Sequence, residues 1–137
     1  MYLSQQDIDR FCAHHKNLYV ILAHVIFVIL LAVALRDIFL IYILIYIVAN
    51  RNIDDEICSL LLIFCSVKIF VPRIRDFRKA ISLVLFAYVL TDVAHYIFKE
   101  IPYNKSYAND PEFIRKKVSH HVYLPYLTMV SAFRFES

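Results

Sequence analysis

The stretch AVALRDIFLIY, residues 32 to 42, places Arg36 and Asp37 side by side in a long apolar run. They are the only charged residues between Leu18 and Ala49. As a single helix this run would be about 48 Å long, whereas the hydrocarbon core of a bilayer is about 30 Å thick. Centring either charge in lipid would cost roughly 2.5 to 3.5 kcal/mol. We therefore predict a turn at Arg36-Asp37 between two antiparallel helices, and the alternative is one bent or steeply tilted helix.

The composition is typical of a membrane protein. Of the 137 residues, 61% are hydrophobic and 20% are charged, and the mean hydropathy is +0.59. Soluble domains are usually about half apolar and about a quarter charged. A chain of this length could not bury three or four long apolar runs in one water-soluble core. We therefore expect an all-α, polytopic membrane helical bundle.

Four apolar segments predict helices within the bilayer. They are residues 18–35, 38–50, 57–71 and 81–98. The second segment would be only about 20 Å long, so a three-span arrangement is the alternative if the first two segments form one helix. Residues 1–17 are a polar N-terminal segment that could form a short amphipathic helix. Residues 99–137 are expected to form a polar tail, because their apolar stretch is short and broken by proline.

A basic loop joins the third and fourth predicted spans. Its cationic residues are Arg73, Arg75, Arg78 and Lys79. The positive-inside rule places this loop in the cytoplasm, so that four spans put both termini outside. In this topology Asp37 and Lys68 lie near the same interface. We therefore predict that Asp37 neutralises Lys68, in an exposed pair that contributes at most about 1 kcal/mol.

Several classes of site are excluded by residue usage. Without glycine the chain has no P-loop, dinucleotide-binding fingerprint, nucleophile elbow or G-x-x-x-G motif. Cys12, Cys58 and Cys65 have no C-x-x-C spacing, which argues against a disulfide framework or a zinc site built on cysteine. The net charge of +3 comes from basic residues beside apolar runs, which favours membrane topology over nucleic-acid binding. We expect a non-enzymatic protein without a cofactor.

Four polar residues are predicted to meet inside the membrane. Tyr88, Asp92 and His95 share one stripe of the last span, at spacings of four and three residues. His24 lies about 9 Å into the first span, which is the depth of Asp92 in the four-span topology. Such a group could bind a metal, ligate haem or relay protons. We favour the structural interpretation, interhelical hydrogen bonds worth roughly 0.6 kcal/mol.

Two histidine pairs flank the spans, at His14-His15 and His120-His121. Membrane di-iron enzymes also place paired histidines beside their spans, but in repeated H-x-x-H-H patterns. This chain has six histidines and no such pattern. We interpret the pairs as polar residues at the membrane surface.

These features predict a multi-pass integral membrane protein, located in the bacterial inner membrane, that acts by binding. The expected role is accessory subunit of a membrane complex, or an immunity or exclusion protein that blocks a membrane-inserting toxin or a phage step. Its expected partners are the lipid bilayer and either another membrane protein or a second copy of itself, and not nucleic acid. The alternative is a small redox or ion-handling subunit that uses His24, Asp92 and His95 for a metal, haem or a proton.

Overall fold

The computed structural model describes residues 5–51, 53–99, 109 and 111–135. Helices make up 81% of these residues and none of them is in a strand, which confirms the all-α prediction. The helices are α1 (Gln5–Ala13), α2 (Leu18–Ala34), α3 (Arg36–Asn50), α4 (Asp55–Phe70), α5 (Phe77–Ile97), α6 (Phe113–Val122) and α7 (Leu124–Phe133).

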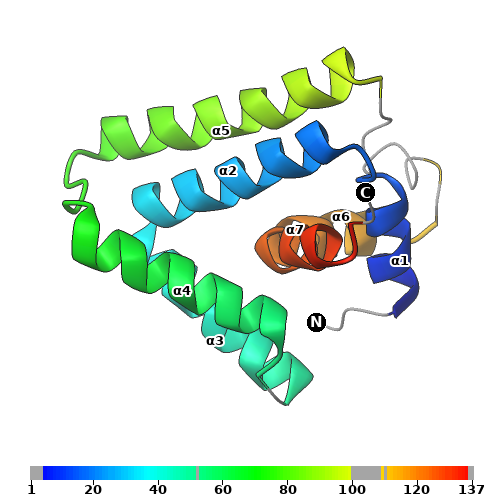
Figure 1. Cartoon of the computed structure of the whole chain (residues 1–137), viewed down its shortest axis with the longest axis horizontal. Coiled ribbons are helices and arrows are strands. Elements are labelled where there is room, and N and C mark those ends of the chain that lie inside the picture. Colours follow the sequence, from blue (N-terminus) through cyan, green and yellow to red (C-terminus); the bar gives the residue numbers. More distant parts are fainter. Residues whose placement is uncertain (1–4, 52, 100–108, 110, 136–137) are drawn as a thin grey trace.

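The helices form two arms that open in a V (Figure 1). One arm consists of α2 and α5 packed side by side, and the other consists of α3 and α4. The arms meet where α2 turns into α3 and where α4 leads into α5. At the open end, α7 lies between the arms and contacts α2 and α4, while α1 packs against α7. The molecule therefore has a turn end and an open end, and the latter carries α1, α6 and α7.

Side-chain caps set the beginnings of three helices. At the start of α2 the side chain of Asn17 accepts hydrogen bonds from two backbone amides. Asp54 and Asp76 each accept one in the same way at the starts of α4 and α5. These caps satisfy backbone N–H groups that have no partner within the helix. The starts of α2 and α4 therefore lie within two residues of the predicted segments, whereas α5 begins four residues before the predicted one.

The turn between α2 and α3 is made without glycine. Leu35 alone separates the helices, with φ −125° and ψ 55°. Arg36 then donates hydrogen bonds to the carbonyls of Val67 and Val71 at the end of α4. A helix leaves its last carbonyls without intrahelical partners, so this contact stabilises both the turn and the end of α4. The chain therefore breaks at Leu35, one residue before the predicted turn at Arg36-Asp37, and α2 and α3 diverge into separate arms instead of packing side by side as an antiparallel pair.

The centre of the open end is α7, although the sequence analysis assigned residues 99–137 to a polar tail. Every residue from Tyr123 to Ser131 is buried. Tyr126 donates a hydrogen bond to Asp54 at 2.9 Å, and Tyr46 of α3 donates to the carbonyl of Val122 at 2.6 Å. The tail prediction does not hold for this stretch. A helix of 10 residues is too short to span a bilayer, but it is long enough to fill the space between the two arms.

Thr128 offers a test of packing in α7, because it is fully buried and its hydroxyl has no hydrogen-bond partner in the described part of the chain. We expect Thr128→Val to raise the free energy of unfolding by about 1 kcal/mol, since valine has nearly the same shape and no unsatisfied hydroxyl. A denaturant titration in mild detergent measures this change. Ser131→Ala is the control and should lower stability, because the Ser131 hydroxyl donates to the Thr128 carbonyl at 2.8 Å. A destabilised Thr128→Val variant would contradict the prediction.

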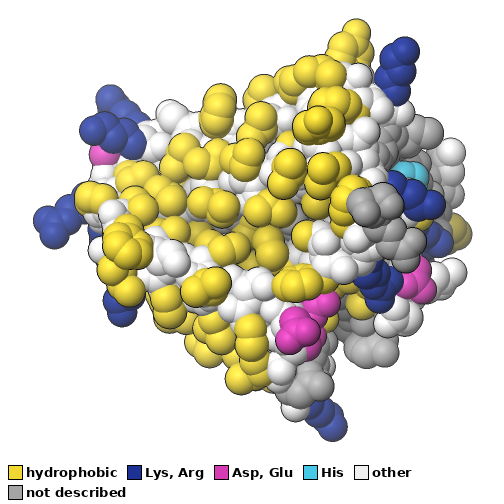
Figure 2. All heavy atoms as spheres, viewed as in Figure 1, with side chains coloured by type: hydrophobic (Ala, Val, Ile, Leu, Met, Phe, Trp, Pro, Cys, Tyr) yellow, Lys and Arg dark blue, Asp and Glu magenta, His cyan; other side chains and the backbone are white. Residues whose placement is uncertain are grey.

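By length and composition, one described helix, α5, could cross a membrane on its own. α1 and α2 are long and apolar enough to do so only when taken together, and the chain bends by 120° at the break between them. The predicted four spans therefore remain a prediction. Figure 2 shows hydrophobic side chains over most of the visible face, with the Lys and Arg side chains mainly at its edges.

Candidate metal centre

Three buried histidines come together at the open end of the α2–α5 arm. His15 lies in the loop between α1 and α2, His24 in the second turn of α2, and His95 in the last turn of α5. Each ring offers one nitrogen, and these three atoms all lie within 4.8 Å of one another. The ring centroids are 4.4 Å, 5.0 Å and 5.1 Å apart. No side chain of the three is more than 6% exposed: the values are 3%, 5% and 6%.

The direction of the helices explains why these residues meet. α2 and α5 run antiparallel, so the beginning of α2 lies beside the end of α5 (Figure 1). His24 and His95 are therefore at the same level of the arm. The chain bends by 120° between α1 and α2, and Asn17 caps the new helix. The bend places His15 against the other two rings.

Backbone hydrogen bonds fix which ring nitrogens of His15 and His24 face the centre. Nδ1 of His15 lies 2.8 Å from the carbonyl oxygen of Phe11, and Nδ1 of His24 lies 2.8 Å from that of Val20. A carbonyl can only accept, so both Nδ1 atoms carry the proton. In a neutral ring Nε2 is then an unprotonated acceptor. The two Nε2 atoms face each other at 3.1 Å.

Two unprotonated nitrogens at this distance repel each other unless a proton or a cation lies between them. A proton would convert one buried ring into a doubly protonated cation. Burial, and after it the neighbouring His24, lowers the pKa of His15 to about 2, which opposes this state. A metal ion bound by both Nε2 atoms would also remove the repulsion between them. Nitrogen ligands bound to a tetrahedral ion at about 2.0 to 2.1 Å lie about 3.3 Å apart, close to the separation of the two Nε2 atoms.

The surroundings of the centre are apolar and tightly packed. The ring of Phe11 stacks on that of His15, with centroids 3.9 Å apart. Val20, Ala23 and Ala94 form a small buried cluster between α2 and α5. Histidines that bind metals usually donate their other ring N–H to a carbonyl or carboxylate, which fixes the tautomer and the ring orientation. The backbone bonds of His15 and His24 are of this kind.

Two of the four residues predicted to share an interhelical surface do meet. His24 and His95 are in contact, as predicted. Tyr88 packs its ring against a phenylalanine of α2, at a centroid distance of 4.9 Å. Asp92 is exposed and belongs to no group of metal-ligating residues in the described chain. The third residue of the centre is His15, from outside the predicted spans.

Each histidine pair has one ring that the interpretation as surface residues missed, since His15 is buried and His120 is half-buried. His15 belongs to the centre, and His120 packs against the same phenylalanine that stacks on His15, at a centroid distance of 5.9 Å. Burial, and after it the neighbouring His121, lowers the pKa of His120 to about 3. One signal was available in the sequence. His15 lies two residues before the Asn17 cap, at the mouth of the span that contains His24.

At the turn end, Asp37 pairs with Arg73 at 2.8 Å. The predicted partner, Lys68, is exposed and lies in the last turn of α4. The first turn of α3 instead faces the loop that follows α4, which brings Arg73 within reach. The other cations predicted for this basic loop are all exposed: Arg75, Arg78 and Lys79.

The pair of Asp37 and Arg73 should be weak, because its side chains are 71% and 54% exposed. We expect a double-mutant cycle with Asp37→Arg and Arg73→Asp to give a coupling free energy of about 0.2 to 1 kcal/mol. Denaturant titrations of the four proteins measure it. The same cycle with Lys68→Asp in place of Arg73→Asp is the control and should be additive. Coupling to Lys68 but not to Arg73 would contradict the observed pairing.

Comparisons with known proteins found no family model, no curated protein and no solved structure that matches this chain. The class of this protein is therefore defined by its own fold and site. It is a helical chain with a three-histidine centre at its open end and a basic loop at its turn end.

Proposed function

We propose that this chain is a multi-pass membrane protein that binds a transition-metal ion of the zinc class at His15, His24 and His95. One observation carries the proposal. The Nε2 atoms of His15 and His24 face each other at 3.1 Å while both Nδ1 atoms are bound to backbone carbonyls. Imidazole nitrogen suits zinc, copper, nickel and iron, and three histidines with one further position are a common zinc arrangement.

The exposed surface supports the membrane part of the proposal. Large apolar side chains more than half exposed occur on several helices, among them Leu44 and Val48 on α3, Leu62, Ile69 and Phe70 on α4, and Leu85, Phe86, Val89 and Tyr96 on α5. Apolar patches of this extent are unusual on a soluble monomer. Contact with lipid would remove this area from water. α2, α3 and α4 reach about 22 to 26 Å, so as spans they would require a locally thinned bilayer.

The metal centre favours the ion-handling role over the partner-binding role that the composition predicted. An accessory subunit or immunity protein would use the exposed faces of the helices and would not need three converging buried rings. Haem fits poorly, because the rings contact one another and small side chains fill the space between α2 and α5. A porphyrin would have to force the two helices apart.

The metal content of purified protein tests the proposal. Wild-type protein, extracted in mild detergent and loaded with zinc or cobalt, should retain about one ion per chain by mass spectrometry. His15→Ala should retain none, and His14→Ala, its neighbour outside the centre, should retain as much as wild type. Equal binding by wild type and His15→Ala would contradict the metal centre. Recovery of the wild-type chain in the soluble fraction without detergent would contradict the membrane location.

The positive-inside rule predicts that the basic loop lies in the cytoplasm and the histidine centre near the opposite surface. In a cysteine-free background, Arg75→Cys should therefore resist an impermeant thiol reagent in intact cells, whereas Lys16→Cys should react. Both residues are exposed, so accessibility to the reagent depends on the side of the membrane. The opposite labelling pattern would reverse the proposed orientation.

A further inference from the structure

Six basic side chains gather at the turn end of the molecule, and we call them the basic patch. They come from the first turn of α3, the last turn of α4, the loop that follows it and the first turn of α5: Arg36, Lys68, Arg73, Arg75, Arg78 and Lys79. Figure 2 shows Lys and Arg side chains projecting at this end beyond the hydrophobic surface. The same turns and loop contain two carboxylates, those of Asp37 and Asp76, so the basic patch has an excess of four positive charges.

Most of the basic patch is not neutralised by the protein itself. Among the described residues, Arg73 is the one member that forms an ion pair, with Asp37 at 2.8 Å. Asp76 caps α5, where its carboxylate accepts a hydrogen bond from the backbone N–H of Arg78. Arg36 donates to backbone carbonyls at the end of α4, which carry no net charge. An anion from outside the chain can therefore compensate the charge that remains.

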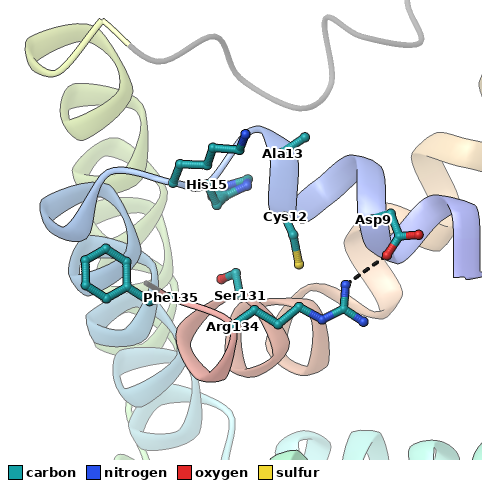
Figure 3. A pocket seen from close by; sticks show the side chains of 8 residues that line it. Asp9, Cys12, Ala13, His15, Ser131, Arg134 and Phe135 are labelled. Carbon is teal, nitrogen blue, oxygen red and sulfur yellow. Dashed lines mark hydrogen bonds and ion pairs between the residues drawn. The ribbon is translucent and has the colours of Figure 1, made fainter. Parts of the chain in front are cut away.

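The arginines of α6 and of the end of α7 are paired instead. Arg134 lies on the wall of a pocket between α1 and α7, where it contacts the carboxylate of Asp9 at 2.8 Å (Figure 3). Arg115 lies 3.0 Å from a carboxylate oxygen of Glu112 and 3.7 Å from one of Asp7. Unpaired positive charge is thus not a general feature of the arginines in this chain. The basic patch differs from the open end in this respect.

A pocket of about 210 Å³ lies within the basic patch. Arg36, Asp37 and Arg73 contribute to its wall, together with apolar residues from the end of α2 and from the loop after α4. The first turn of α3 forms one side, and no side chain caps this helix. The backbone N–H groups of a first turn favour an anion. The volume of the pocket admits one phosphate group with a few waters.

Exposed apolar side chains adjoin the basic patch. Ile69 and Phe70 follow Lys68 at the end of α4, and Phe77 precedes Arg78 at the start of α5. These three apolar side chains are 73%, 80% and 75% exposed. At a bilayer surface, apolar side chains favour the acyl chains while basic side chains reach the headgroups. Their alternation therefore fits a lipid surface better than a water-soluble polyanion.

We propose that the basic patch binds the headgroup of an acidic phospholipid, with the phosphate in the pocket between Arg36 and Arg73. The inference rests on the membrane location proposed above and not on the metal centre. The positive-inside rule places the turn end at the cytoplasmic leaflet, and clusters of about four to eight basic residues beside a span are typical of sites for acidic lipids. A zwitterionic headgroup carries its own cation, so it gains less from the excess charge of the patch.

Native mass spectrometry of the full chain in mild detergent tests this preference. From an equal mixture of phosphatidylglycerol and phosphatidylcholine, wild-type protein should retain the acidic lipid at least about tenfold more often. Arg73→Gln and Arg75→Gln should each lower this ratio about two- to fivefold, the contribution expected of one basic residue. Asp37→Asn should raise the ratio, because it removes the carboxylate from the pocket wall and the partner of Arg73. Arg134→Gln is the matched control and should leave the ratio unchanged.

Arg73→Gln and Asp37→Asn each break the same ion pair, so a loss of folding would change the ratio in one direction, whereas charge recognition requires opposite directions. Equal retention of the two lipids by wild type would overturn the lipid proposal. So would a ratio that is unchanged in Arg75→Gln, or one that falls as far in Arg134→Gln. Displacement of the lipid by a millimolar excess of inorganic phosphate would mean that the pocket binds free phosphate, which also overturns the proposal. Recovery of the wild-type chain in the soluble fraction without detergent would instead overturn the membrane location, and with it the proposed function.

Discussion

Replacing His24 by alanine is expected to lower the affinity of the protein for zinc or cobalt by at least about a hundredfold. The substitution removes one of only three nitrogen ligands from the centre. Loss of a group that merely orients a ligand typically costs 10- to 100-fold in metal affinity, so loss of a ligand should cost more. Competition with a chromophoric chelator measures the dissociation constant of each variant. His95→Ala should behave in the same way.

The control for this experiment is Asp92→Asn, which alters an exposed residue one turn from His95. It should leave metal affinity unchanged, whereas the ligand set considered from the sequence would require a large loss. His24→Gln keeps a side chain of similar size and should also lose the metal, which guards against an effect of the cavity left by alanine. If His24→Ala weakened binding no more than Asp92→Asn, the metal would have to bind elsewhere.

Lowering the pH from 7 to 5 is expected to reduce the free energy of unfolding of the metal-free protein by about 4 kcal/mol. Two rings outside the predicted spans contribute. Burial lowers the pKa of His15 to about 2 and that of His120 to about 3, from 6.5 in the unfolded chain. Below pH 6.5 the unfolded state binds protons at these rings and the folded state does not, so stability falls with pH until the folded pKa values are reached. At pH 5 each ring accounts for about 2 kcal/mol.

Denaturant titrations at the two pH values, in the presence of a chelator, measure this difference. His15→Ala and His120→Ala should each remove about half of the pH dependence. The exposed His121 is the matched control for His120, and His121→Ala should keep the wild-type dependence. The ionisable neighbours of His15 are His24, His95 and His120, and they are also histidines, so none of them supplies a negative charge that would favour protonation. A pH-independent stability would mean that both rings are solvated.

The local features of the fold could be predicted from the sequence because they depend on neighbouring residues. The apolar runs predicted four long helices, and the structure has them, although α5 begins at Phe77, four residues before the predicted segment. The adjacent charges of Arg36 and Asp37 predicted a turn, since neither a long lipid-buried helix nor a charge at its centre is favourable. The residue count grouped His24 with the polar stripe of the last span but placed it level with Asp92, which is exposed, whereas the structure places His24 against His95.

The rest was decided by tertiary structure, because it depends on distances between segments far apart in the sequence. The short length of α7 showed only that it cannot span a bilayer. Its burial depends on the space between the two arms, which it fills. The partner of Asp37 depended on which side of α4 faces the turn, which selected Arg73 over Lys68. His15 looked like a surface residue until the bend after α1 turned its ring toward His24. Because the place of this ring depends on the 120° bend between α1 and α2, only the folded chain determines that three histidines share one centre.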